Sequence, residues 1–108
     1  MRSWEISTLD VQPHNPAVLD SEQEGRAIVI NLPAGERLQQ HQVHERAWLL
    51  VVSGVIEIED SGGESISGGT GLLAEFDPNE RREVSASEDS RLLLLLSPWP
   101  GEGHPSQR

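Results

Sequence analysis

The sequence predicts an all-β protein built as one antiparallel barrel or sandwich. Short runs of β-branched and aliphatic residues recur roughly every 8–12 residues. Gly, Pro, Asn or Asp separates most of these runs. No segment keeps a 3.6-residue apolar period, so we expect little or no helix. A chain of 108 residues has room for a single domain with one core.

The expected strands follow one another along the chain. Residues 26–32 (RAIVINL) form the first clear strand, which Pro33-Ala34-Gly35 ends. Residues 47–52 (AWLLVV) are continuously apolar, which is typical of a strand covered on both faces. Residues 55–59 (VIEIE) alternate apolar and acidic side chains, as expected for one buried face. Further strands are expected at residues 36–42, 64–67, 72–76, 82–87 and 91–96.

The two ends of the chain differ from its middle. Pro13, Asn15 and Pro16 interrupt any long regular element, so residues 1–25 are expected to form an N-terminal arm with short strands. Residues 26–97 are expected to form the barrel. Residues 98–108 carry Pro, Gly and Ser with no apolar pattern after Trp99, which predicts a flexible tail.

The composition excludes several classes of function. Eight basic and 18 acidic residues give a net charge of −10, so repulsion from phosphates argues against nucleic-acid partners. No stretch is long enough to span a membrane, and the N-terminus lacks the apolar core of a signal peptide. The absence of cysteine excludes disulfides and thiolate metal sites. We therefore expect a soluble cytoplasmic protein without nucleic-acid or membrane partners.

The spacing of residues in two segments of the chain resembles the motifs of a known family. The first part reads Gly35, five residues, His41, one residue, Val43, three residues, Ala47, six residues and Gly54. This spacing resembles the first motif of the cupin family, G-x5-H-x-H-x3-E-x6-G. The second part reads Gly71, five residues, Asp77, one residue, Asn79, two residues, Arg82, three residues and Ala86. It is similar to the second cupin motif, G-x5-P-x-G-x2-H-x3-N.

The resemblance covers about residues 26–97 and implies an antiparallel double-stranded β-helix, the jelly-roll barrel of cupins. The spacing agrees better than the residues do. Of the four positions that hold metal ligands in the family, only His41 keeps a ligand. Val43, Ala47 and Arg82 stand at the other three positions.

These replacements predict that no metal or other cofactor is bound. A stable divalent site needs about three protein ligands that each donate a lone pair. Val43 and Ala47 have none, and the guanidinium of Arg82 stays protonated and repels cations.

Two alternatives could restore a metal site. A bulge near Val43 could turn His44 or Glu45 toward His41. Alternatively, the second motif could be displaced by one residue, as the position of Pro78 indicates.

Alternation along the expected strands predicts a pocket inside the barrel. His41, Val43, Ala47 and Leu49 share the inward face, and Arg82 enters from the second motif. We take these five residues as the candidate ligand pocket. A pocket with an apolar wall, an imidazole and a guanidinium suits a small molecule that carries a carboxylate or phosphate.

Two of these residues could instead have purely structural roles. Arg82 could instead pair with Glu80 or Glu83, or lie at the surface beside Arg81. His41 could be a hydrogen-bonded structural residue.

The outward face of residues 47–52 requires a cover. Trp48, Leu50 and Val52 would form an exposed apolar strip, which monomers avoid. The resemblance implies dimers in which an N-terminal strand joins the partner's sheet, and Trp4 could anchor such an arm. We therefore predict a homodimer.

The main functional hypothesis is a small-molecule binding protein without the usual metal, in a sensory or accessory role. One alternative is an enzyme. The resemblance implies metal-dependent dioxygenases or isomerases, and a metal-free isomerase or lyase could use His41 as base and Arg82 as electrophile. The other alternative is a dimerising interaction module with a filled barrel. The sequence assigns no catalytic residue, because this fold serves many unrelated activities.

Overall fold

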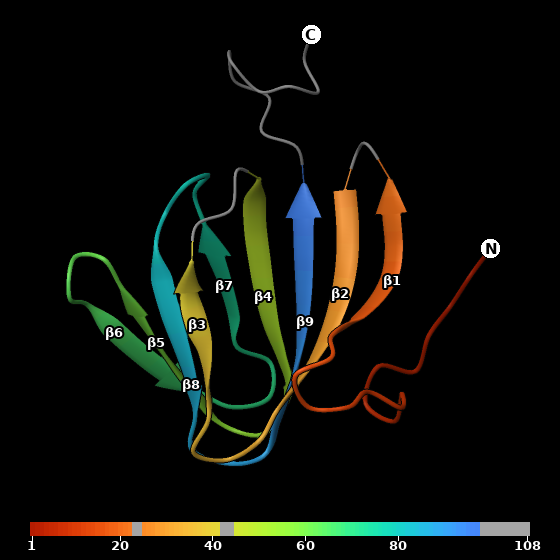
Figure 1. The fold of residues 1–108 in the computed structure, drawn as a ribbon, viewed down its shortest axis with the longest axis horizontal. Helices are drawn as coiled ribbons and strands as arrows, with labels where there is room; N and C mark the ends of the chain where they lie inside the picture. Colours follow the sequence, from red (N-terminus) through yellow and green to blue (C-terminus); the bar gives the residue numbers. More distant parts are fainter. Residues whose placement is uncertain (23–24, 42–44, 98–108) are drawn as a thin grey trace, which may run out of the picture.

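A computed structural model describes residues 1–22, 25–41 and 45–97 of the chain. Nine strands in this part form two sheets that face each other, and no described residue is helical (Figure 1). The strands are β1 (Ala17–Glu22), β2 (Gly25–Leu32), β3 (Arg37–His41), β4 (Arg46–Ser53), β5 (Ile56–Asp60), β6 (Ser65–Gly68), β7 (Leu73–Phe76), β8 (Arg82–Ala86) and β9 (Ser90–Ser97).

The topology is antiparallel throughout the two sheets. The five-stranded sheet has the order β1-β2-β9-β4-β7, and the four-stranded sheet has the order β3-β8-β5-β6. The predicted all-β fold class is confirmed. Each strand expected between residues 26 and 96 has a counterpart whose ends differ by at most one residue. From the predicted arm, β1 pairs with β2 at the edge of the larger sheet. The predicted tail, residues 98–108, lies outside the described residues.

The core lies between the sheets because alternate side chains of each strand face inward. In β4 the inward residues are Ala47, Leu49 and Val51, all buried. The register places Leu49 opposite Leu94 of β9. The smaller sheet contributes buried residues of β5 and β8, so both sheets share a single core. Burial of apolar surface is the main force that holds such layers together.

Three glycines of the motif frames turn the chain with positive φ angles. Gly35, Gly54 and Gly71 have φ values of 83°, 91° and 96°. The turn at Gly54 lies so close to the β8–β9 connection that an added Cβ would be 2.4 Å from the carbonyl oxygen of Asp89. Glycine is required there both by φ and by space.

The N-terminal segment contacts the larger sheet through its backbone. Arg91 of β9 donates hydrogen bonds to the carbonyl oxygens of Ile6 and Leu9. Asn31 of β2 donates from Nδ2 to the carbonyl oxygen of Val11 at 2.9 Å. These contacts fix the chain just before β1. The described part of the chain contains no helix that could cross a membrane.

Candidate functional site

A cavity of about 400 Å³ lies between the two sheets. Its described lining comes from six strands and from the residue that precedes β1. The lining residues are Pro16, Val18, Ile28, Ile30, Leu38, Leu49, Arg82, Val84 and Leu94. Val18 is 58% exposed, so the cavity reaches the surface beside β1.

Arg82 is the one charged residue among the described residues that line this cavity. It begins β8, and only 6% of its surface is exposed. Its Cζ lies 4.8 Å from the centre of the Phe76 ring, within the range of a cation–π contact. Burial lowers the pKa of the guanidinium, and the nearby charge of Glu80 acts in the opposite direction. Arginine nevertheless stays protonated near neutral pH, so the cavity wall carries a buried positive charge.

The structure brings two of the five predicted pocket residues, Leu49 and Arg82, to this cavity. Ala47 is fully buried and opposite Phe76 in the sheet register; it belongs to the core but is not among the described residues that line the cavity. His41 ends β3, and its backbone is paired with that of Arg82. The side chain of His41, and all of Val43, lie outside the described residues.

The structural alternatives for Arg82 can be compared with its position. A surface location is wrong, because the residue is buried. Glu83 is hydrogen-bonded to Arg37 at 3.0 Å. The Glu80 carboxylate accepts the Asp77 N–H at 3.0 Å and also acts electrostatically on the guanidinium of Arg82.

The residues at the motif positions do not fit the metal that the cupin resemblance implies. Ala47 offers no lone pair at its buried position, and Arg82 places a permanent positive charge at the cavity. Glu45, one of the proposed replacement ligands, pairs with Arg26 at 2.6 Å. Among the side chains that the structure describes, no three or more His, Cys, Asp or Glu are grouped to hold a metal ion. His44 lies outside the described residues.

The register shift in this region lies within β3, between Leu38 and His41, where the pairing with β8 is irregular. The bulge considered from the sequence lies near Val43, which is outside the described residues. Leu38 pairs with Val84 on one side of this irregularity, and His41 pairs with Arg82 on the other side.

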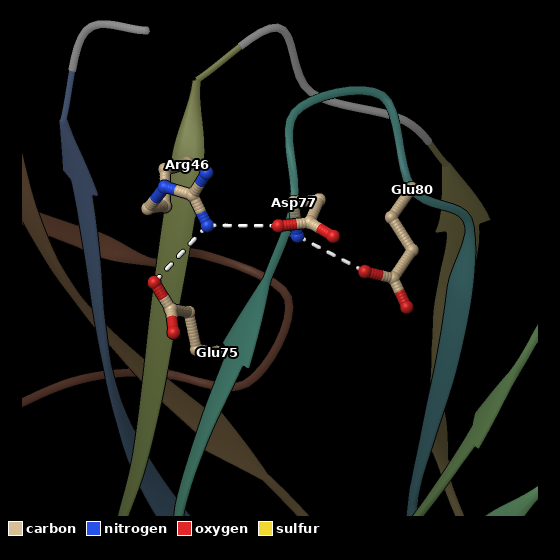
Figure 2. Close-up of polar contacts among 4 residues, drawn as sticks. All are labelled: Arg46, Glu75, Asp77 and Glu80. Atoms are coloured by element: carbon tan, nitrogen blue, oxygen red, sulfur yellow. Dashed lines mark hydrogen bonds and ion pairs between the residues drawn. The ribbon is translucent and has the colours of Figure 1, made fainter.

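The loop before Arg82 is held by a polar cluster that the sequence does not indicate. Arg46 of β4 donates to Glu75 at 3.1 Å and to Asp77 at 2.8 Å (Figure 2). Hydrogen bonding to Asp77 is the largest contribution that raises the pKa of Arg46. Glu80 then accepts the backbone N–H of Asp77. The turn Asp77-Pro78-Asn79-Glu80 can be recognised in the sequence. Its partner Arg46 cannot, because it lies 31 residues before Asp77. This cluster positions the connection between Phe76 and β8.

The opposite face of the larger sheet carries an apolar strip. The register places Trp48 of β4 beside Leu95 of β9, and Leu50 between Leu93 and Leu73. Leu73 is 59% exposed and Leu95 is 40% exposed. We call Trp48, Leu50, Leu73, Leu93 and Leu95 the outer strip. It lies behind the cavity on the other side of the same sheet.

Two facing antiparallel sheets with an apolar cavity between them fit the double-stranded β-helix that the motif spacing predicts. Comparison with solved structures gives the same class. An RmlC-like cupin protein from Desulfovibrio desulfuricans has a TM-score of 0.80 at 17% identity, over 90% of this chain and 96% of that chain. An uncharacterized conserved protein with a double-stranded beta-helix domain from Klebsiella pneumoniae has a TM-score of 0.77 at 16% identity, over 90% of each chain.

A further similar structure is the DMSP lyase DddQ from Ruegeria pomeroyi, with a TM-score of 0.71 at 18% identity, over 82% of this chain and 47% of that chain. No protein-family model matches the chain, and neither does any curated protein. At these identities the likeness establishes the fold. The chain has the cupin fold that its two motif frames predict.

Proposed function

We propose that this protein binds a small anionic molecule in the interior cavity, in a sensory or accessory role in the cytoplasm. The observation that supports this most strongly is the position of Arg82, a buried cation on the wall of an otherwise apolar cavity of about 400 Å³. Pockets for small molecules commonly combine a mainly apolar lining with a few polar groups that orient the ligand.

The energetics of a buried charge favour an anionic ligand. Removing a guanidinium from water costs several kcal/mol unless opposite charge and hydrogen bonds compensate. Glu80 and the Phe76 ring are among the protein groups that compensate the charge of Arg82. An anion in the cavity would add to this compensation, and the planar guanidinium can bind a carboxylate or phosphate through two parallel hydrogen bonds.

A screen of small carboxylates and phosphates by amide NMR tests this proposal. We expect a binding anion to shift the amide signals of Leu49, Val84 and Leu94. Val18→Trp should weaken the effect, because a bulkier side chain would narrow the exposed side of the cavity.

Ile66→Trp is the matched control, since Ile66 is 51% exposed and lies away from this cavity. If no anion shifts these signals at millimolar concentration, the anion-binding proposal is wrong. The interaction module with a filled barrel would then be the better hypothesis.

We also propose that the protein is a homodimer in which the outer strip is covered by the partner. The strip joins three neighbouring strands, and its leucines at positions 73 and 95 are substantially exposed. Contiguous apolar patches of this kind are typical of interaction sites.

Light scattering at micromolar concentration tests the dimer. One chain has a mass of 11.9 kDa, so the expected dimer mass is about 24 kDa, twice that value. Leu95→Lys should give the mass of one chain, because it places a charge in the outer strip. Ile66→Lys, at an exposed residue on β6, should remain dimeric. A monomer mass for the wild-type protein would contradict the proposal.

A further inference from the structure

We propose that the ligand of the interior cavity is a monocarboxylate with a compact apolar body. This inference rests on the proposed function and narrows it to one chemical class. It follows from the charge at the cavity, the shape of the anchoring group, the chemistry of the wall and the available volume.

The charge at the cavity favours a ligand with a single negative charge. Arg82 is the only charged residue in the described lining, and the nearby Glu80 already offsets part of its single positive charge. A phosphate monoester carries about −1.5 to −2 at neutral pH, so part of its charge would remain uncompensated. Uncompensated buried charge is strongly unfavourable. The net charge of −10 on the chain adds to the repulsion of a dianion.

The anchoring group has the shape of a carboxylate site. The Phe76 ring lies 4.8 Å from Cζ of Arg82 and contacts the guanidinium. A guanidinium has five N–H donors in its plane, so it can bind protein partners and a ligand together. Two of these donors match the two oxygens of a carboxylate in a planar arrangement.

The rest of the wall selects an apolar body. Ile28, Ile30, Leu38 and Leu94 contribute only hydrocarbon side chains to the cavity. A hydroxyl or an ammonium group placed against them would lose its hydrogen bonds to water without gaining new ones. An ammonium group would also be repelled by Arg82. Sugar acids and free amino acids are therefore poor candidates.

The volume sets an upper limit on the size of the ligand. A water molecule occupies about 30 Å³ in the liquid, so about 400 Å³ holds roughly a dozen groups of that size. A monocarboxylate of about 8–12 non-hydrogen atoms satisfies this limit. Octanoate, with about ten such atoms, is a suitable probe.

The test compares octanoate with two probes of similar length, octan-1-ol and hexyl phosphate, by NMR titration at neutral pH. We expect octanoate to bind most tightly, and hexyl phosphate to bind at least about tenfold more weakly, because its second charge is not compensated. Arg82→Met should weaken octanoate binding by about 10- to 100-fold, the effect of losing a charge-assisted hydrogen bond. The same variant should leave octan-1-ol binding almost unchanged.

Arg81→Met is the matched control, because Arg81 is exposed, adjacent in sequence and absent from the described cavity lining. It removes the same charge from the chain and should leave octanoate binding unchanged. If Arg82→Met does not fold, Val18→Trp replaces it, with Ile66→Trp as its control. Equal loss of octanoate binding in a variant and its control would overturn the inference.

The outcomes also separate this inference from the proposed function. If hexyl phosphate binds as tightly as octanoate or more tightly, the monocarboxylate class is wrong while anion binding stands. If octan-1-ol binds as tightly as octanoate, Arg82 does not anchor the ligand and the inference fails. If octanoate shifts no cavity amide, the inference fails, and the wider anion screen then decides the proposed function.

Discussion

Gly54→Ala should destabilise the fold, because the turn at Gly54 has no room for a Cβ atom. Gly54 joins β4 to β5 with a φ of 91°. An alanine Cβ at this position would lie 2.3 Å from Oγ of Ser90 and 2.4 Å from the carbonyl oxygen of Asp89. Real Cβ atoms do not approach other atoms this closely. The β8–β9 connection would therefore have to move away from the turn.

Two costs add up in this variant. A left-handed conformation costs about 1–2 kcal/mol for a residue with a Cβ. Forcing an extra carbon against packed backbone costs about 1–3 kcal/mol more. The sum of about 2–5 kcal/mol is a large part of the 5–15 kcal/mol typical of a domain. The displacement would also disturb Ser90, whose hydroxyl donates to the carbonyl oxygen of Glu88 at 2.8 Å.

Urea denaturation followed by tryptophan fluorescence measures the effect. With a denaturant dependence of about 2 kcal/mol per molar, the midpoint should fall by roughly 1–2.5 M. Gly35→Ala is the matched control, since its φ is 83° and no atom lies within 4 Å of the added Cβ. It should lose only about 1–2 kcal/mol. Equal losses in the two variants at the same protein concentration would refute the argument from close packing.

Three further predictions concern the core, the buried charge and a turn. Leu92→Ala, at a fully buried residue, should lower the free energy of unfolding by about 2–5 kcal/mol, measured by urea denaturation; a loss below about 1 kcal/mol would contradict the packing. Because burial lowers the pKa of Arg82, the folded state disfavours its proton; this cost begins to fall only when the pH rises through the lowered pKa, and it is gone above the pKa of the unfolded chain. Arginine keeps its proton well above neutral pH, so the stability difference between wild type and Arg82→Met should be the same at about pH 5 and about pH 8; a clear slope would show that another group is coupled to Arg82. Asp89→Ala removes the acceptor of the Ala34 N–H at 2.9 Å and should lower the free energy of unfolding by about 0.5–1.5 kcal/mol in urea denaturation; an unchanged midpoint would show that this hydrogen bond does not stabilise the fold.

The strands were predictable because their signals are local. Apolar alternation and turn residues define each strand over fewer than ten residues, and the structure keeps these boundaries to within one residue from β2 to β9. The inward direction of Leu49 followed from the same alternation. The motif spacing aligned Arg82 with a metal-ligand position but left the direction of its side chain open; in the structure Arg82 begins β8 and lines the cavity.

The remaining walls of the cavity could not be predicted in this way. Ile28 and Leu94 come from β2 and β9, which are adjacent in the sheet although more than 60 residues separate them in the sequence. Only the topology shows that they share a wall with Arg82. The contacts of Arg46 with Glu75 and Asp77 are also long-range, and surface ion pairs leave no periodic signal.

The two motifs combine residues that serve different purposes. The matching glycines at positions 35, 54 and 71 all have positive φ, so the backbone path itself depends on them. The positions that hold metal ligands in the family do not determine the backbone path in this way. Ala47 and Arg82 occupy two of them in an intact fold, with Ala47 packed in the core and Arg82 at the cavity. This explains how the frame of a metal-binding motif can persist when most of its metal ligands are absent.

The position of β9 determines when the larger sheet can assemble. Every other strand of the described residues precedes it in the sequence, yet it lies between β2 and β4 (Figure 1). Before β9 is synthesised, the β1–β2 pair and the β4–β7 pair have no strand to connect them. Folding therefore depends on contacts between distant residues, which are slow to form. A nascent chain would expose the apolar faces of both pairs during this time, and its acidic charge would help to keep neighbouring chains apart.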